Sequence, residues 1–73
     1  MAHLPVLSGE KLISIFQRVG YVVVRQRGSH VRLSHSNKRS ITIPKHDFIG
    51  PSLLKKILRD AELSLEKFLD LLK

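Results

Sequence analysis

The chain has 73 residues and a formal net charge of +7, from 13 Lys and Arg against 6 Asp and Glu. This length accommodates one domain, and we expect residues 1–73 to form it, with residues 1–7 as a frayed N-terminus. The absence of cysteine excludes disulfides, thiol catalysis and thiolate zinc sites. No apolar run approaches the ~20 residues of a membrane-spanning helix, and no signal-peptide pattern opens the chain, so we expect a cytoplasmic protein.

The positive charge is concentrated in one segment. Residues 18–45 contain seven basic residues, as many as the net charge, and no Asp or Glu lies between Glu10 and Asp47. They are Arg18, Arg25, Arg27, Arg32, Lys38, Arg39 and Lys45. An acid-free basic segment is typical of a protein that binds a polyanion. The alternative is a basic surface that serves only solubility.

The first expected element is a helix from about Gly9 to Val19. Its apolar positions recur at helical spacing. They are Leu12, Ile13, Phe16 and Val19. Ser8 can cap the first turn, and Gly20 suits the left-handed position just past the last turn.

A three-stranded sheet is expected next. The strands are residues 21–24, about 29–34 and 40–44, and residues 35–39, including His35, form a solvated loop. Arg27 and Gly28 can serve as a two-residue hairpin loop, with Gly28 supplying a positive φ. Apolar and polar residues alternate in the second and third strands, which predicts a sheet with one buried face.

The hairpin loop fixes an expected register. With Arg27 and Gly28 in the loop, Arg25 faces His30, Val24 faces Val31 and Val22 faces Leu33. The valines then lie on the core face. On the opposite face Arg25 and Arg32 flank His30, and two guanidinium groups beside an imidazole suit a phosphate.

Helices complete the expected fold. Pro51 suits the first turn of a helix, whose apolar stripe runs from Leu53 to Ala61. Ser64 can cap a short last helix that carries Phe68. Two or three helices against one antiparallel sheet form an α+β sandwich.

Several motifs in order resemble the HicA family, the toxins of HicA–HicB toxin–antitoxin systems. They are Val-Gly-Tyr at 19–21, Arg-Gln-Arg-Gly-Ser-His at 25–30, Ile-Pro-Lys-His at 43–46 and Gly-Pro-Ser-Leu-Leu-Lys-Lys-Ile-Leu at 50–58. The resemblance extends from about Ser8 to Leu69. It implies a fold similar to a double-stranded-RNA-binding domain: a helix, a three-stranded antiparallel sheet and a helix, here with a short extra C-terminal helix.

The same resemblance implies a function. Members are mRNA interferases of type II systems, that is, endoribonucleases that use no metal or other cofactor, and the catalytic histidine corresponds to His30. The implied partners are mRNA and a HicB-type antitoxin. Two residues depart from the family pattern. Glu62 replaces the usual Gly after the second long helix, which affects how that helix ends, and Ser52 stands where Thr is common.

RNA cleavage can also be argued from the residues. RNA carries its own nucleophile, the 2′-hydroxyl, so the protein has to move protons and stabilise charge on phosphorus. Imidazole suits proton transfer at cellular pH, which favours His30. His46 is the best candidate for a second proton carrier, with water as the alternative, although His46 after Pro44 also fits a residue that only shapes a turn. The expected RNA contacts are Arg25, Arg27, Ser29, Arg32, Lys38, Arg39 and Lys45.

Two other functions fit the sequence. The first is a non-catalytic RNA-binding module of the same fold, in which His30 only contacts phosphate or a 2′-hydroxyl. The second is a protein-interaction subunit whose basic surface binds an acidic partner. Cleavage of RNA in the presence of a chelator distinguishes the nuclease from both.

Overall fold

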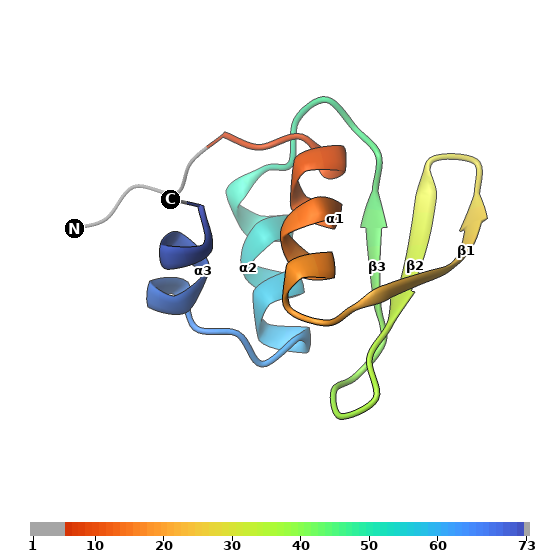
Figure 1. Cartoon of the computed structure of the whole chain (residues 1–73). Coiled ribbons are helices and arrows are strands. Elements are labelled where there is room, and N and C mark those ends of the chain that lie inside the picture. The colour runs from red at the N-terminus through yellow and green to blue at the C-terminus, as the bar shows by residue number, and fades with distance from the viewer. Residues whose placement is uncertain (1–5, 73) are drawn as a thin grey trace.

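The computed structural model describes residues 6–72 (Figure 1). The elements in chain order are α1 (Gly9–Arg18), β1 (Val22–Arg27), β2 (His30–Ser34), β3 (Ile41–Pro44), α2 (Pro51–Asp60) and α3 (Leu65–Leu71). Most of the expected frayed terminus lies outside the described residues. Leu7, at its end, is instead buried and forms a β-bridge with Ile49.

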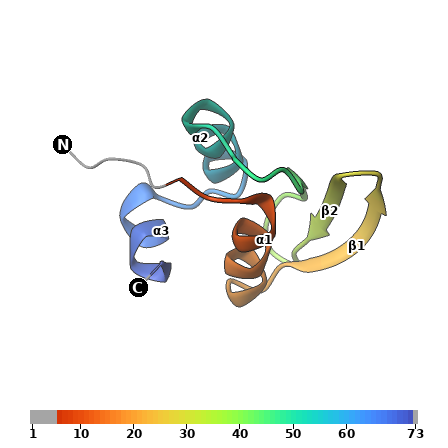
Figure 2. The same cartoon turned by 90° about the horizontal axis from the view of Figure 1, so that it is seen from above.

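The helices and the sheet form separate layers. The strands lie in the order β1-β2-β3, and both neighbouring pairs are antiparallel. Figures 1 and 2 show the helices on one side of the sheet and nothing on the other. Both α1 and α2 pack against β3, and β1 lies farthest from the helices. This confirms the expected α+β fold.

The predicted helix caps are present. The Ser8 hydroxyl accepts a hydrogen bond from the Lys11 amide (3.1 Å), and the Ser64 hydroxyl accepts one from the Lys67 amide (3.1 Å). Each bond satisfies an amide that the first helical turn leaves without a partner. Gly20 has a φ of 111°, a conformation that favours glycine, and it turns the chain from α1 into β1.

α2 ends although glycine is missing from its expected position. Glu62 itself adopts a φ of 55°. The Leu63 amide donates to the Leu58 carbonyl (2.9 Å), and the Glu62 amide donates to the Arg59 carbonyl (3.0 Å). This is the bonding pattern of a helix terminus with a left-handed residue. Glu62 therefore ends the helix in the conformation that glycine adopts without strain.

The β1–β2 register differs from the expected one. The hairpin turn consists of Gly28 and Ser29, not Arg27 and Gly28. Arg27 consequently faces His30, and Arg25 faces Arg32. The pairing of Arg25 with His30 was wrong.

The valines of β1 are not part of the core, contrary to the expectation. The strand register shifts between Val23 and Arg25, so that Val23 faces Leu33 and Val22 faces Ser34. Every residue of β1 is exposed. The physical reason is the position of the helices, which pack over β3 and leave β1 uncovered.

The core lies between the helices and the inner face of β2 and β3. Its buried hydrophobic residues are Leu7, Leu12, Ile13, Ile15, Phe16, Tyr21, Val31, Leu33, Ile41, Ile43, Ile49, Leu54, Ile57, Leu58, Ala61 and Phe68. Phe16 and Tyr21 pack edge to face, with ring centroids 5.5 Å apart. Within residues 6–72, no helix is long and apolar enough to span a bilayer.

Candidate nucleic-acid interface

Two cross-strand rows of residues lie on the open face of the sheet. Arg25 faces Arg32, which in turn faces Thr42; in the next row Arg27 faces His30, which faces Pro44. Directly opposed residues in an antiparallel sheet project to the same side. His30 and the three arginines therefore share the face opposite the buried Val31 and Leu33.

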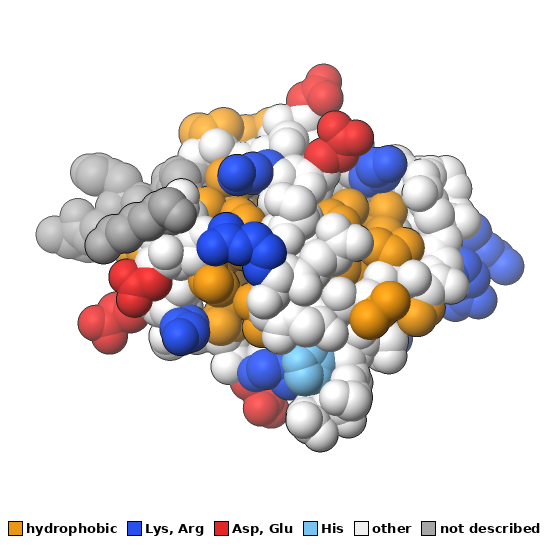
Figure 3. Space-filling view, in the orientation of Figure 1, with side chains coloured by type: hydrophobic (Ala, Val, Ile, Leu, Met, Phe, Trp, Pro, Cys, Tyr) orange, Lys and Arg blue, Asp and Glu red, His pale blue; other side chains and the backbone are white. Residues whose placement is uncertain are grey.

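These side chains surround a shallow hollow of about 190 Å³. Its lining residues are Arg25, Arg27, His30, Arg32 and Thr42. None of them carries a carboxylate. In Figure 3, Lys and Arg side chains gather at the edge of the molecule formed by the sheet, with no Asp or Glu beside them. The hollow thus concentrates positive charge around one exposed imidazole.

The arginines are arranged at a cost to the sheet. Arg25 and Arg32 are directly opposed like charges, which destabilises a strand pair by roughly 0.2–1 kcal/mol. The Arg32 guanidinium is oriented by β3, since its Nη1 donates to the Thr42 hydroxyl (3.0 Å). An anion bound between the guanidinium groups would remove the repulsion, and phosphate oxygens match their geometry.

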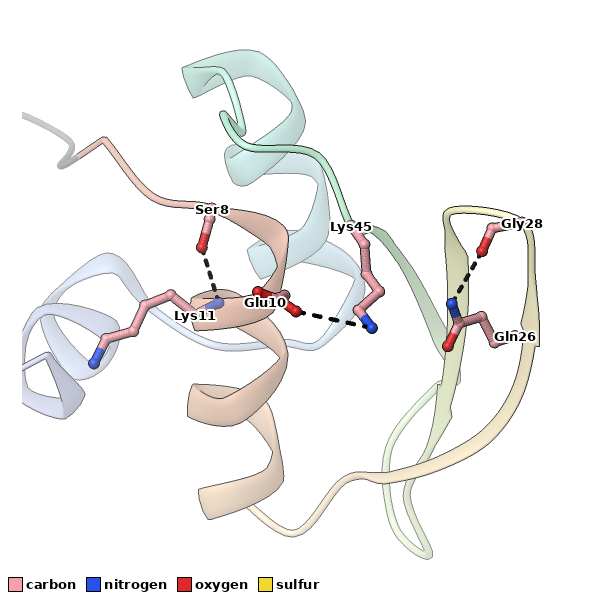
Figure 4. A network of polar contacts seen from close by, with 6 residues as sticks. All are labelled: Ser8, Glu10, Lys11, Gln26, Gly28 and Lys45. Carbon is pink, nitrogen blue, oxygen red and sulfur yellow. Dashed lines mark hydrogen bonds and ion pairs between the residues drawn. The ribbon is translucent and has the colours of Figure 1, made fainter.

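The turn that precedes His30 is fixed by hydrogen bonds. Gly28 has a φ of 56°. The side-chain Nε2 of Gln26 donates to the Gly28 carbonyl (3.0 Å), a bond drawn in Figure 4. The Ser29 carbonyl accepts a hydrogen bond from the Lys45 amide (2.6 Å), which joins the turn to the end of β3. Ser29 thus holds the turn through its backbone carbonyl and does not line the hollow.

Lys45 lies between the sheet and α1. Its Nζ is 3.9 Å from Glu10 Oε1, and both side chains are solvent-accessible. Figure 4 shows the two side chains directed toward each other. An exposed ion pair of this length contributes little to stability. Lys45 does not line the hollow, so the structure puts it near the hairpin turn and outside the arginine cluster.

Two other predicted RNA contacts lie at the far end of the sheet. Lys38 and Arg39 belong to the β2–β3 loop, at the opposite end from the β1–β2 turn (Figure 1). Lys38 Nζ donates to the Ala61 carbonyl at the end of α2 (3.0 Å), and the Arg39 carbonyl accepts from the Tyr21 hydroxyl (2.8 Å). The structure does not bring either residue to the hollow.

His46 also lies outside the hollow. Its side chain is exposed, and its carbonyl accepts a hydrogen bond from the Gly9 amide (2.8 Å) at the start of α1. The geometry therefore offers no support for His46 as a partner of His30. Thr42, in contrast, is a site residue that the sequence reasoning missed. The alternation of Ile41, Thr42 and Ile43 was the available signal, because it places Thr42 on the open face.

His35 is a structural residue and not part of a solvated loop. Its ring is half-buried and packs edge to face on Tyr21, with centroids 5.0 Å apart. Nδ1 accepts a hydrogen bond from the Asn37 amide (2.9 Å), and Nε2 lies 3.3 Å from the Val19 carbonyl. A hydrogen on Nε2 satisfies both contacts.

Tyr21 is a buried ionisable group on the helix side of the sheet. Burial raises the pKa of its phenol above the usual value, and the charge of the Glu62 carboxylate adds to this increase. Its hydroxyl remains satisfied by the Arg39 carbonyl.

Across residues 6–72, no group of three or more His, Cys, Asp or Glu side chains could hold a metal ion.

Comparison with known protein families gives a match. A family model described as the HicA toxin of bacterial toxin–antitoxin systems matches residues 9–63, more than half of the 73-residue chain. The matched span runs from the start of α1 to the turn after α2 and includes the whole sheet. No curated protein matches the chain.

Proposed function

The chain belongs to the HicA toxin family, and on that premise we propose that it is an mRNA interferase, an endoribonuclease that cleaves RNA on the open face of its sheet. The observation that carries the proposal is the hollow in which three arginines and Thr42 surround the exposed His30. Positive charge without a neighbouring carboxylate suits a phosphodiester, and an imidazole supplies proton transfer.

The proposed reaction uses the nucleophile of the substrate. The 2′-oxygen attacks the neighbouring phosphorus, so that a P–O2′ bond forms and the P–O5′ bond breaks. His30 accepts the 2′-hydroxyl proton, and water supplies a proton to the departing 5′-oxygen. The products are a 2′,3′-cyclic phosphate and a 5′-hydroxyl. The balance requires no oxidant, reductant or metal ion.

The arginines have a separate role in this mechanism. Negative charge develops on the non-bridging phosphate oxygens during the attack, and guanidinium groups fixed in advance stabilise it. Arg25 and Arg32 lie in one row and Arg27 lies beside His30 in the next. Thr42 is a positioning residue, because its hydroxyl accepts from Arg32 Nη1 and holds that guanidinium over β3.

The proposal includes inhibition by an antitoxin of the HicB type. A basic surface with an exposed catalytic group is inhibited most directly by an acidic protein that occupies the phosphate sites. Charge complementarity both accelerates such an encounter and excludes RNA. We therefore expect the antitoxin to cover His30 and the arginine face.

The test is cleavage of a defined mRNA by the purified chain, with and without EDTA. Cleavage that persists in EDTA and yields cyclic phosphate ends supports the proposal. RNA binding without cleavage would instead indicate a non-catalytic RNA-binding module. A chain that neither binds nor cleaves RNA, but still binds an acidic protein, would be a protein-interaction subunit.

A further inference from the structure

Strand β1 exposes an unusual run of hydrophobic side chains. Val22, Val23 and Val24 are 61%, 39% and 58% exposed. Six large hydrophobic residues of the described chain are exposed, and three of them occupy these consecutive positions. Figure 3 shows hydrophobic side chains on this side of the molecule beside the Lys and Arg of the sheet edge. Adjacent exposed apolar residues of this kind mark interaction surfaces.

Within residues 6–72, the same strand has a free hydrogen-bonding edge. In the sheet order β1-β2-β3, β1 pairs with β2 on one side only. No helix makes substantial contact with it, since α1 and α2 pack on β3. The outward amides and carbonyls of an edge strand can pair with an added strand. Val22 to Val24 would supply the apolar contacts of that pairing.

The charge of β1 selects the kind of strand that can be added. Arg25 and Arg27 continue the strand beyond the valines, and no acidic residue lies on it. A second copy of this chain carries +7 as well, so self-pairing brings like charges together. RNA gains little from aliphatic side chains, because single-stranded bases stack on aromatic ones. A protein strand with apolar and acidic side chains can provide apolar contacts for the valines and carboxylates for the arginines.

We propose that β1 accepts an added strand from the antitoxin, with apolar side chains on Val22 to Val24 and acidic side chains toward Arg25 and Arg27. This inference rests on the proposed function and specifies how the partner docks. Arg25 and Arg27 also line the hollow around His30. A strand added to β1 therefore blocks the phosphate site from its edge.

The first experiment is amide hydrogen exchange of this chain, free and in complex with a HicB-type antitoxin. The proposal expects slower exchange along β1 in the complex. A complex that forms while β1 exchanges as in the free chain would overturn the strand pairing and leave the nuclease intact. Slow exchange of β1 in the free chain that depends on concentration would assign the edge to a second copy and overturn the proposal as well.

The second experiment uses a matched pair of variants. The double variant Val22→Thr with Val24→Thr replaces one methyl group of each valine by a hydroxyl group. Both side chains stay β-branched, so the hairpin should fold. The antitoxin Kd should rise about tenfold, from the lost burial of two methyl groups. Val6→Thr, at an exposed valine outside the sheet, should leave the Kd unchanged.

RNA cleavage by the free variants separates the two proposals. The valine pair lies outside the hollow, so its cleavage rate should equal that of the wild type. Weaker antitoxin binding with unchanged cleavage supports the added strand. If the wild type, the valine double variant and Val6→Thr bind the antitoxin with equal Kd values while all three cleave RNA, the added strand is overturned. If the valine substitutions weaken antitoxin binding but even the wild-type chain does not cleave RNA, the added strand is supported and the proposed nuclease function is refuted.

Discussion

His30 differs from the other described histidines in its neighbours. His35 is half-buried and uses both ring nitrogens in contacts with the backbone. His46 is exposed beyond the end of β3 and does not line the hollow. His30 is exposed, and three guanidinium groups share its face of the sheet. Among these three, it alone combines a solvent-accessible imidazole with neighbouring guanidinium groups, an arrangement that suits a phosphate.

Replacing His30 with Ala should abolish RNA cleavage while folding and RNA binding remain. The side chain projects from the open face, so its truncation creates no core cavity. General acid–base catalysis contributes ~10²–10⁴-fold, and the loss should appear in turnover and not in affinity. Single-turnover cleavage and equilibrium binding measure the two effects separately. Wild-type turnover by the folded variant would refute the assignment.

The companion variant His46→Ala identifies the second proton carrier. If water donates to the 5′-oxygen, turnover should stay near the wild-type rate, as the position of His46 outside the hollow indicates. A loss as large as that of His30→Ala would instead assign the proton to His46.

Tyr21 should make the protein less stable at alkaline pH. Its pKa is raised in the folded state, so above about pH 10 the unfolded chain loses the phenol proton while the folded chain retains it. Unfolding then releases a proton, and the free energy of unfolding falls as pH rises through this window. Tyr21→Phe should unfold with a shallower dependence on pH above 10. If urea titrations give the same pH dependence of the free energy of unfolding for the wild type and Tyr21→Phe, Tyr21 is not its origin.

The β1–β2 hairpin shows why part of the site could be predicted despite a wrong register. Near the turn, the partner of Arg25 moves by two residues, from His30 to Arg32. Because side chains alternate between faces, an even shift keeps them on the same face. Beyond the irregularity the shift is odd, with Val23 facing Leu33. There the predicted core face of the valines was lost.

Removing the two opposed arginines should reduce the salt dependence of RNA binding. Each phosphate contact to single-stranded RNA contributes ~0.7 to the slope of log K against log salt, so Arg25→Ala with Arg32→Ala should lower its magnitude by about 1.4. The matched control is Lys11→Ala with Lys67→Ala, which removes the same charge from α1 and α3. Figure 4 shows Lys11 directed away from the sheet. Equal slopes for the two double variants would place RNA elsewhere.

The end of α2 offers a stabilising substitution. Glu62 has a φ of 55°, which costs an L-residue roughly 1–2 kcal/mol relative to glycine. Glu62→Gly should therefore raise the free energy of unfolding by about 1 kcal/mol, after the entropy that glycine adds to the unfolded chain. The control Glu66→Gly lies in the first turn of α3 and should lower it by about 1 kcal/mol. Urea denaturation measures the free energy of unfolding of both variants. A Glu62→Gly variant that is less stable than the wild type would contradict backbone strain at Glu62.

At the scale of the whole molecule, the uncovered face of the sheet carries His30 and three arginines, and the other face is packed with helices. A domain of this size gains only a small excess of burial energy over the entropy of folding. An antitoxin that covers the open face should therefore stabilise the toxin noticeably. Binding at 100 times Kd adds ~2.7 kcal/mol, which corresponds to a rise in Tm on the order of 10 °C for a small domain.

Differential scanning fluorimetry of the toxin with increasing antitoxin measures this shift. The rise should diminish with added salt, because the covered surface is basic. An unchanged Tm at saturating antitoxin would show that the two proteins do not form the expected complex.

The sequence by itself determined the order of the elements, the caps at Ser8 and Ser64, and the common face of Arg25, Arg32 and His30. These features depend on spacing, on side-chain alternation and on hydrogen bonds between near neighbours, all of which are local. Only the tertiary structure decided that Val22 and Val24 are exposed, that Lys38 holds the end of α2, and that Thr42 orients Arg32. Each of these depends on which elements pack together, and two helices that cover β3 leave β1 bare.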